Sequence, residues 1–212
     1  HGAVVELLMG DARVDVNCVD RESLTPLMWA SDQGHAPVVR FILLDERVDP
    51  NLTEDTGCTA MILAADRGHL EVVEALLDHP RLSSPNVANE RRYTPLLAAA
   101  ARGHTSIVRL LLKHRRVNPC VGGNHGGTAV TLAAEQGHLD LMDLLLTDRR
   151  VDPNTANDYG NTAAIWAAEK GHGAIMARLL RDDRVDPNPV NDRGRTALMY
   201  GAARNPLDVV EK

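Results

Sequence analysis

Apolar positions recur with a helical period in short stretches along the chain. In two clear examples they fall at i, i+1, i+4 and i+5, namely Val38, Val39, Ile42 and Leu43, and Val72, Val73, Leu76 and Leu77. This spacing predicts helices with one apolar face. Helices of only about two turns are marginal in isolation, so each is expected to be stabilised by packing against its neighbours.

Three markers recur in one register and predict an array of repeats. The pair Gly-His occurs at 34–35, 68–69, 103–104, 137–138 and 171–172, and a tail reading Val-Asp-Pro-Asn occurs at 48–51, 151–154 and 185–188. A threonine precedes each first helix, at Thr25, Thr59, Thr94, Thr128, Thr162 and Thr196. The period is 34 residues, with one extra residue between the third and fourth units. A fixed period in this range is typical of solenoid proteins.

Each repeat can be divided into elements on physical grounds. Thr25 followed by Pro26 is a favourable helix start, because threonine caps the helix and proline suits its first position. Small residues such as Ala64 and Ala65 then allow neighbouring helices to approach closely. The glycine of each Gly-His pair is expected to end this helix in the left-handed conformation. A second helix follows, and the Asp-Pro tail then extends the chain.

Two stretches show the family resemblance most clearly. "TGCTAMILAADRGHLEVVEALL", starting at Thr56, and "DRGRTALMYGAA", starting at Asp192, resemble the ankyrin repeat. The resemblance covers essentially the whole chain and implies an all-α solenoid of stacked helix-turn-helix repeats with β-hairpin or loop connections. Two departures stand out. The family's usual histidine is replaced by Met28, Ile62, Leu97, Thr131, Ile165 and Met199, and Arg92 stands where glycine is expected, which puts the geometry of that hairpin in doubt.

The predicted organisation is a single array over residues 1–212. Its units are 1–17 (partial), 18–51, 52–86, 87–120, 121–154, 155–188 and 189–212 (partial). Because both ends fall inside a repeat, we expect the sequence to be a fragment of a longer chain.

Composition narrows the function classes. The chain has 44% apolar and 25% charged residues, three widely spaced cysteines and a net charge of −6. An odd, sparse set of cysteines favours a reducing compartment, so a cytoplasmic or nuclear location is expected. The negative charge argues against nucleic acid as the partner, no apolar run is long enough to span a membrane, and a monomer is expected.

Candidate chemistry is weak. Gly122 and Gly127 have the spacing of a phosphate-binding loop, but Thr128 stands where lysine is needed, which favours a repeat hairpin. Six histidines, including His35 and His69, share one repeat position, where hydrogen bonding at a helix start is a better interpretation than metal binding. No catalytic motif is present, so no enzymatic role and no cofactor are expected. The tail asparagines Asn17, Asn51, Asn86, Asn154 and Asn188 are interpreted as structural, although the resemblance also allows hydroxylation.

Charge and aromatic residues mark a candidate binding region. Repeat 87–120 carries Arg91, Arg92, Arg102, Arg109, Lys113, Arg115 and Arg116 against the single acid Glu90. These cations either balance neighbouring acids or bind an acidic segment. Five of the six aromatic residues fall in hairpins or first helices. Trp29, Trp166 and Tyr200 occupy equivalent positions, and packing between repeats is an alternative role for them.

In ankyrin-like proteins the hairpins and first helices form the concave binding face. The resemblance therefore implies a non-catalytic module or scaffold that binds a protein or peptide. The candidate contact residues are Arg21, Glu22, Trp29, Asp32, Asp55, Arg67, Arg91, Arg92, Tyr93, Arg102, His125, Tyr159, Trp166, Lys170 and Arg193. The alternative is a structural or regulatory segment of a larger enzyme, channel or receptor-like protein, packed on its own chain.

The hairpin of the fifth unit (121–154) is a special case. Gly123 replaces the polar residue found at Asp20, Glu54, Asn89, Asn157 and Asn191, so a turn-stabilising hydrogen bond is lost. We expect this hairpin to be the most mobile of the internal ones.

Overall fold

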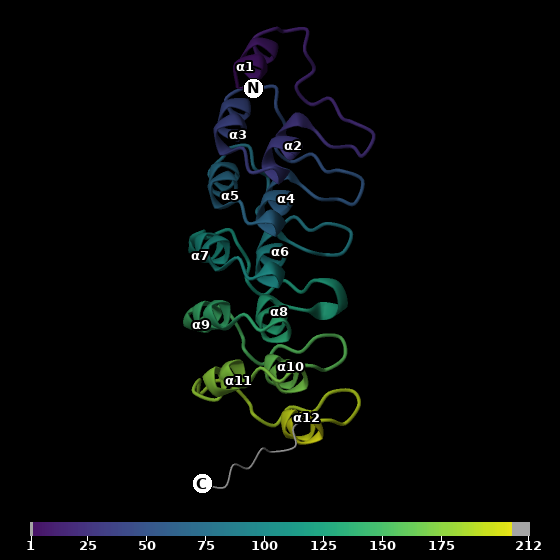
Figure 1. Ribbon diagram of the computed structural model, residues 1–212, viewed down its shortest axis with the longest axis vertical. Helices are drawn as coiled ribbons and strands as arrows, with labels where there is room; N and C mark the ends of the chain where they lie inside the picture. The colour runs from purple at the N-terminus through teal and green to yellow at the C-terminus, as the bar shows by residue number, and fades with distance from the viewer. Residues whose placement is uncertain (1, 205–212) are drawn as a thin grey trace. The chain divides into compact units, whose positions relative to one another are not determined.

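The computed structural model describes residues 2–204 of the 212-residue chain (Figure 1). Over this range the chain forms twelve α-helices and one 3-10 helix, and its only strand-like pairing is an isolated antiparallel bridge between Thr53 and Thr59. The all-α prediction is confirmed. The helices are α1 (Gly2–Met9), α2 (Pro26–Asp32), α3 (Ala36–Leu43), α4 (Ala60–Arg67), α5 (Leu70–Leu77), α6 (Pro95–Arg102), α7 (Thr105–Lys113), η1 (Asn124–Gly126), α8 (Ala129–Gln136), α9 (Leu139–Thr147), α10 (Ala163–Lys170), α11 (Gly173–Leu179) and α12 (Ala197–Arg204).

The chain divides into two compact units, with the boundary in the sequence between Asn118 and Pro119, and each unit is described separately. In the first unit α2 packs on α4 and α4 on α6, while α3, α5 and α7 form a second row and α1 packs on α3 (Figure 1). In the second unit α8, α10 and α12 form one row and α9 and α11 the other. We call α2, α4, α6, α8, α10 and α12 the inner helices and α3, α5, α7, α9 and α11 the outer helices. Within residues 2–204 no helix has the length and apolar character that crossing a membrane requires.

The helix ends follow the predicted chemistry. The Thr25 hydroxyl accepts a hydrogen bond from the Met28 amide at 3.2 Å, and the equivalent bond forms at Thr59, Thr94, Thr162 and Thr196. At Thr128 the capping bond is a different one: the Thr131 hydroxyl accepts from the Thr128 amide at 2.8 Å. The Gly-His glycines are left-handed as expected, with φ between 73° at Gly103 and 88° at Gly68 among the helix C-caps.

The histidines of the Gly-His pairs correct one prediction. None of these side chains caps its own helix. Instead, ring Nε2 of His69 lies 2.9 Å from the Asp32 carbonyl oxygen, at the end of the preceding inner helix, and His104 and His172 make the same contact with Asp66 and Glu135. The His69 ring also covers Gly34, where a Cβ atom would lie 2.5 Å from Nδ1. The glycine therefore provides both a left-handed turn and room for the histidine of the next repeat.

The tail asparagines also join successive repeats. The Asn51 side chain donates to the Arg81 carbonyl at 2.9 Å and accepts from the Ser83 amide at 2.8 Å. Asn17, Asn86 and Asn154 make the same pair of bonds. The structural interpretation is thus confirmed for these four, with the difference that the bonds reach the next repeat and not the residue's own hairpin. Their hydroxylation stays untested.

The core of each unit lies between its two helix rows. Its largest fully buried side chains include Leu76, Leu97 and Leu111 in the first unit and Leu145 and Ile165 in the second. The small pairs are buried as expected, and Ala64 and Ala65 are 0% exposed. The loops that precede the inner helices lie outside this core and project from each unit (Figure 1).

Candidate partner-binding surface

Six loops share one backbone hydrogen-bond pattern, and each directly precedes an inner helix. We call these loops fingers. They span 20–25, 54–59, 89–94, 123–128, 157–162 and 191–196. In each, the amide of the first residue donates to the carbonyl of the fifth, as in Asn157 to Asn161 at 3.0 Å. The first side chain accepts backbone amides in five fingers, at Asp20, Glu54, Asn89, Asn157 and Asn191. Gly123 lacks this anchor, and the mobility expected for its finger stays a prediction.

The fourth residue of every finger is left-handed. It is Ser23, Gly57, Arg92, Gly126, Gly160 or Gly194, and φ lies between 59° and 80°. Arg92 thus adopts the same turn as the glycines, at φ 59°. The substitution leaves the hairpin geometry intact, but it places an exposed arginine in a conformation that disfavours a side chain.

The glycine cluster at Gly122–Gly127 forms an ordinary finger. The amides of Gly123, Gly126 and Gly127 donate to carbonyls within the finger, so they do not point toward a common anion. This agrees with the hairpin interpretation of the cluster. Among the described residues, His, Cys, Asp and Glu side chains form no group of three or more that could hold a metal ion.

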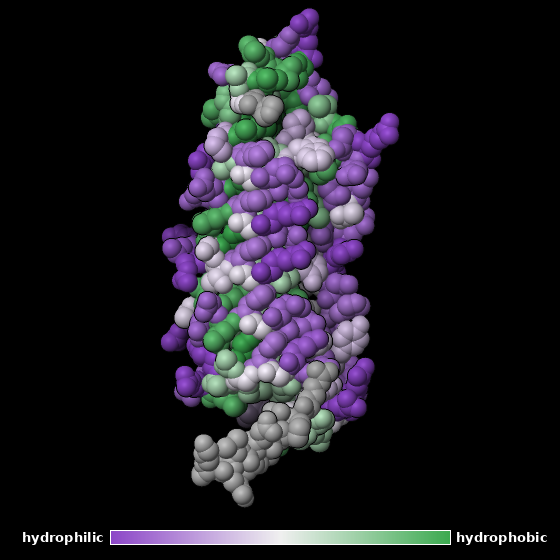
Figure 2. Space-filling view, in the orientation of Figure 1, coloured by the Kyte–Doolittle hydropathy of each residue, from purple (hydrophilic) through white to green (hydrophobic). Residues whose placement is uncertain are grey.

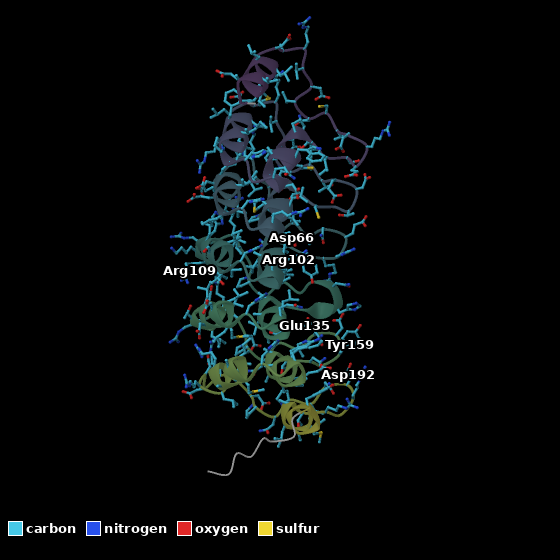
Figure 3. The ribbon with its side chains drawn as sticks, viewed as in Figure 1. Asp66, Arg102, Arg109, Glu135, Tyr159 and Asp192 are labelled. Atoms are coloured by element: carbon cyan, nitrogen blue, oxygen red, sulfur yellow. The ribbon has the colours of Figure 1, made fainter. Side chains whose placement is uncertain are left out.

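The charged residues at the ends of the inner helices pair between successive repeats. Arg67 Nε lies 2.9 Å from Asp32, and Arg102 Nε lies 3.0 Å from Asp66 (Figure 3). In the second unit, Lys170 lies 3.9 Å from Glu135. The bond to Asp66 raises the pKa of Arg102 above its ordinary value. Figure 2 shows the resulting polar cover over α4 and α6.

The basic repeat therefore divides into two groups. Arg102 pairs with Asp66, and Arg116 donates to the carbonyls of Leu82 and Ser83, so these two stabilise their own unit. Among the described residues, no ion pair or side-chain hydrogen bond engages the exposed Arg91, Arg92, Arg109, Lys113 and Arg115. Arg91 and Arg92 lie on a finger, whereas Arg109 and Lys113 lie on the outer helix α7, at the opposite edge of the unit (Figure 3).

The remaining candidates of the first unit lie on its fingers and on α2. Arg21 and Glu22 are exposed, and Tyr93 is half-buried. Asp55 accepts from the Ser23 hydroxyl at 2.6 Å and so links two fingers. Trp29 is 47% exposed, and its indole N–H donates to Asp20 at 2.7 Å.

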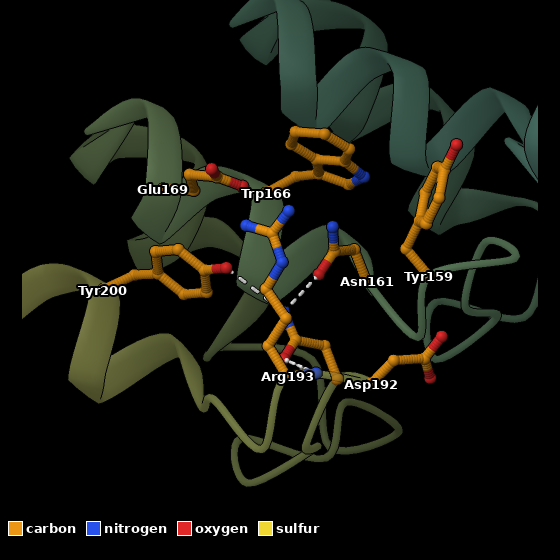
Figure 4. Close-up of a pocket in the computed structure, with 8 residues that line it drawn as sticks. Tyr159, Asn161, Trp166, Glu169, Asp192, Arg193 and Tyr200 are labelled. Atoms are coloured by element: carbon orange, nitrogen blue, oxygen red, sulfur yellow. Dashed lines mark hydrogen bonds between the residues drawn. The ribbon is translucent and has the colours of Figure 1, made fainter.

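In the second unit, the side chains gather around a pocket of about 240 Å³ (Figure 4). Predicted residues Tyr159, Trp166 and Arg193 line it, together with Asn161, Glu169, Asn191, Asp192 and Tyr200. Tyr159 is 51% exposed and its hydroxyl lies 3.2 Å from His125 Nδ1, which brings two predicted residues together. Lys170 Nζ lies 5.3 Å from the centre of the Trp166 ring.

Five pocket residues were not among the candidates. Packing between repeats is the alternative role considered for Tyr200, and its side chain is 7% exposed. Asn161 and Asn191 are buried, at 7% and 6% exposed, and are joined by a 2.7 Å hydrogen bond. The two residues lie in successive fingers, 30 residues apart, and the only signal in the sequence is that both are polar. No local pattern would have shown that they meet.

Similarity to known proteins decides the family. The model for ankyrin repeats, in three copies, matches residues 1–89, 80–157 and 132–212. The chain belongs to the ankyrin-repeat family. Ankyrin repeats are generally protein–protein interaction modules. No curated protein matches this ankyrin-repeat chain.

Solved ankyrin structures have the same fold. The ankyrin repeat protein EF0377 is 30% identical, with a TM-score of 0.78 over 90% of this chain and 92% of that one. The ankyrin repeat domain of Bcl-3, a member of the IkappaB protein family, has a TM-score of 0.81 over 94% and 86% of the two chains. At 24% identity, that likeness concerns the fold alone.

Proposed function

We propose that this ankyrin-repeat chain is a non-catalytic scaffold that binds a protein or peptide partner through its fingers and inner helices. The observation that carries the proposal is that these elements present exposed Trp29 and Tyr159 together with three cations, Arg91, Arg92 and Arg193, whose side chains have no partner among the described residues. Tryptophan, tyrosine and arginine are the side chains that most often contribute large shares of interface energy.

The unpaired cations define a finer proposal for repeat 87–120. Arg91 and Arg92 are exposed on its finger, so an acidic partner segment would meet two cations that no described residue neutralises. Such charges raise the association rate, and salt weakens their effect. Arg102 contributes less, because its guanidinium already pairs with Asp66.

Photo-crosslinking of the full chain tests the surface. A benzoyl-phenylalanine replaces exposed Tyr159 on a finger or, as a matched control, exposed Arg109 on outer helix α7. In a lysate of the cells that produce the protein, the finger position is expected to yield a discrete crosslinked partner, and position 109 is not. Crosslinks from position 109 alone would contradict the proposed surface.

The sequences that flank residues 1 and 212 separate this proposal from its alternative. A catalytic or membrane domain in those flanks would favour a regulatory array that packs on its own chain. Further repeats alone would favour a free-standing adaptor, for which we propose a monomer in the cytoplasm or nucleus.

A further inference from the structure

Three hydrogen bonds of Asn191 fix how the pocket of the second unit presents its polar atoms. Asn191 Oδ1 accepts the amides of Arg193 and Arg195, each at 3.0 Å, which identifies its other terminal atom as the nitrogen. That nitrogen donates to Asn161 Oδ1 at 2.7 Å. The Asn161 amide group is thereby oriented as well, with its oxygen engaged and its NH₂ directed toward Trp166 (Figure 4).

The Asn161 NH₂ is a donor without a partner among residues 2–204, on a side chain only 7% exposed. Its nitrogen is not one of the fully buried polar atoms that lack a partner, so water reaches it, and the acceptor of a ligand can take the place of that water. Two more donors line the same pocket. The Trp166 indole N–H and the Arg193 guanidinium also lack a partner within the described part of the chain.

On the Arg193 side of the pocket, the unpaired guanidinium favours an anionic acceptor. Arg193 enters the pocket. Lys170, whose charge is already paired with Glu135, lies 5.3 Å from the centre of the Trp166 ring, and Arg195 lies 5.5 Å from that of Tyr200. Two acids line the pocket, Glu169 and Asp192, and neither pairs with Arg193 within the range of a salt bridge. The Asp192 carboxylate points away from Arg193 in Figure 4. Glu169 is therefore the one lining acid that opposes an anion on the Arg193 side.

We propose that this pocket binds the carboxylate of an aspartate or glutamate side chain in the partner peptide. Arg193 supplies the charge, and Trp166 Nε1–H and the Asn161 NH₂ supply hydrogen bonds that orient the carboxylate. The aromatic rings of Trp166 and Tyr159 cover the methylene groups of the same side chain. This inference rests on the proposed function, because it names the chemistry that the second unit recognises in a partner.

Nuclear magnetic resonance on the full chain tests the proposal directly. The protein has two tryptophans, so its indole N–H spectrum contains two signals, which Trp29→Phe assigns. The probe is the capped tripeptide acetyl-Gly-Glu-Gly-methylamide, added to about 20 mM because one charge-assisted contact is expected to bind in the millimolar range. The Trp166 signal is expected to shift, and the Trp29 signal is expected to stay in place.

Three comparison peptides distinguish the possible ligands. The peptide with Gln in place of Glu is expected to bind about tenfold more weakly, since it loses the charge-assisted bonds. An equal response to Gln would overturn the proposal, as would a preference for the Lys peptide. Binding of acetyl-Gly-Gly-Gly with a free C-terminus, without binding of the Glu peptide, would assign the pocket to a chain terminus and would also overturn it.

Two variants complete the test. Arg193→Gln is expected to reduce affinity for the Glu peptide about tenfold, with Arg109→Gln as a control that leaves it unchanged. Glu169→Gln is expected to strengthen binding, because it removes a like charge, whereas a pocket for cations would be weakened by the same change. If no indole signal responds to any peptide while position 159 still crosslinks to a partner, the carboxylate proposal fails and the proposed function stands.

Discussion

Two fingers are followed by a tryptophan at the same place in the next inner helix, Trp29 in α2 and Trp166 in α10, and the two indole groups are bonded differently. In the finger at 20–25, Asp20 Oδ1 accepts the amides of Glu22 and Leu24, and Asp20 Oδ2 accepts the Trp29 indole N–H at 2.7 Å. In the finger at 157–162, Asn157 Oδ1 accepts the equivalent amides of Tyr159 and Asn161. Its second terminal atom is a nitrogen, which cannot accept a hydrogen bond, so the Trp166 N–H has no partner among residues 2–204.

The comparison shows that one terminal atom of the side chain serves the fold of the finger and the other affects the binding surface. The oxygen that holds the turn is present in both aspartate and asparagine, so both fingers fold alike. The other atom decides whether the neighbouring tryptophan is satisfied within its own repeat or is left to meet a partner. A repeat array can thus change its binding surface without a change in its fold.

The largest expected effect concerns the left-handed residue of the finger at 157–162. Gly160 has φ 71°, and a Cβ atom there would lie 2.9 Å from the Asn191 Cα. Gly160→Ala is expected to lower the free energy of unfolding by about 2 kcal/mol, through the left-handed strain and the added contact. Urea denaturation followed by circular dichroism measures the change.

Gly194→Ala is the matched control, because Gly194 occupies the same finger position at φ 70° and no described atom lies within 4 Å of a Cβ added there. It is expected to lose only the conformational part, about 1 kcal/mol. Equal losses at both positions would show that contact between fingers contributes nothing.

The second prediction converts one finger into the other. Asn157→Asp supplies the acceptor that Asp20 supplies to Trp29, and it adds a negative charge beside the pocket. Affinity for the Glu peptide is expected to fall about tenfold, measured by the shift of the Trp166 indole signal. Asp20→Asn, the reverse change in the other finger, is expected to leave this affinity unchanged. If Asn157→Asp leaves the affinity unchanged, the Trp166 indole N–H does not take part in the proposed contact.

The third prediction uses the left-handed position in the first unit. Arg92 has φ 59°, and its side chain has no partner among the described residues. Arg92→Gly is expected to raise the free energy of unfolding by about 1 kcal/mol, since glycine adopts this conformation without strain. Ser23→Gly, at φ 60°, should gain less because it also loses the 2.6 Å bond to Asp55. Thermal denaturation compares the two, and a loss of stability in Arg92→Gly would contradict the argument.

Features fixed within one repeat could be predicted from the sequence. Thr94 and Gly103 act on their own helix, so the cap and the left-handed end follow from local chemistry. Features fixed between repeats could not. The His104 ring bonds to Asp66, 38 residues away, and the Asn161 amide is oriented by Asn191, 30 residues away. The pairing of Arg102 with Asp66 was open for the same reason, because two charges in register show a contact only once the packing of the helices is known.

The smallest expected effect is a difference in pH response between the two tryptophans. Hydrogen bonds from the Leu24 amide and then from the Trp29 indole hold the pKa of Asp20 below its ordinary value. A lowered folded-state pKa means that the stabilisation is present above the unfolded value of about 3.9 and is lost as pH falls through the folded value. In Trp166→Phe, where only Trp29 emits, fluorescence is therefore expected to stay constant from pH 7 to about 4 and to change below that.

Trp29→Phe, where only Trp166 emits, is expected to show no such step at a pH where circular dichroism still reports folded helices. Asp20→Asn in the Trp166→Phe background should abolish the step, since an amide does not titrate. A midpoint at or above about pH 4 would contradict the bond between Asp20 and Trp29, because an unbonded carboxylate titrates there. The midpoint of the fluorescence change thus measures how strongly the Trp29 indole binds the Asp20 carboxylate in competition with a proton. It also tests the contrast with Trp166, whose indole has no such carboxylate.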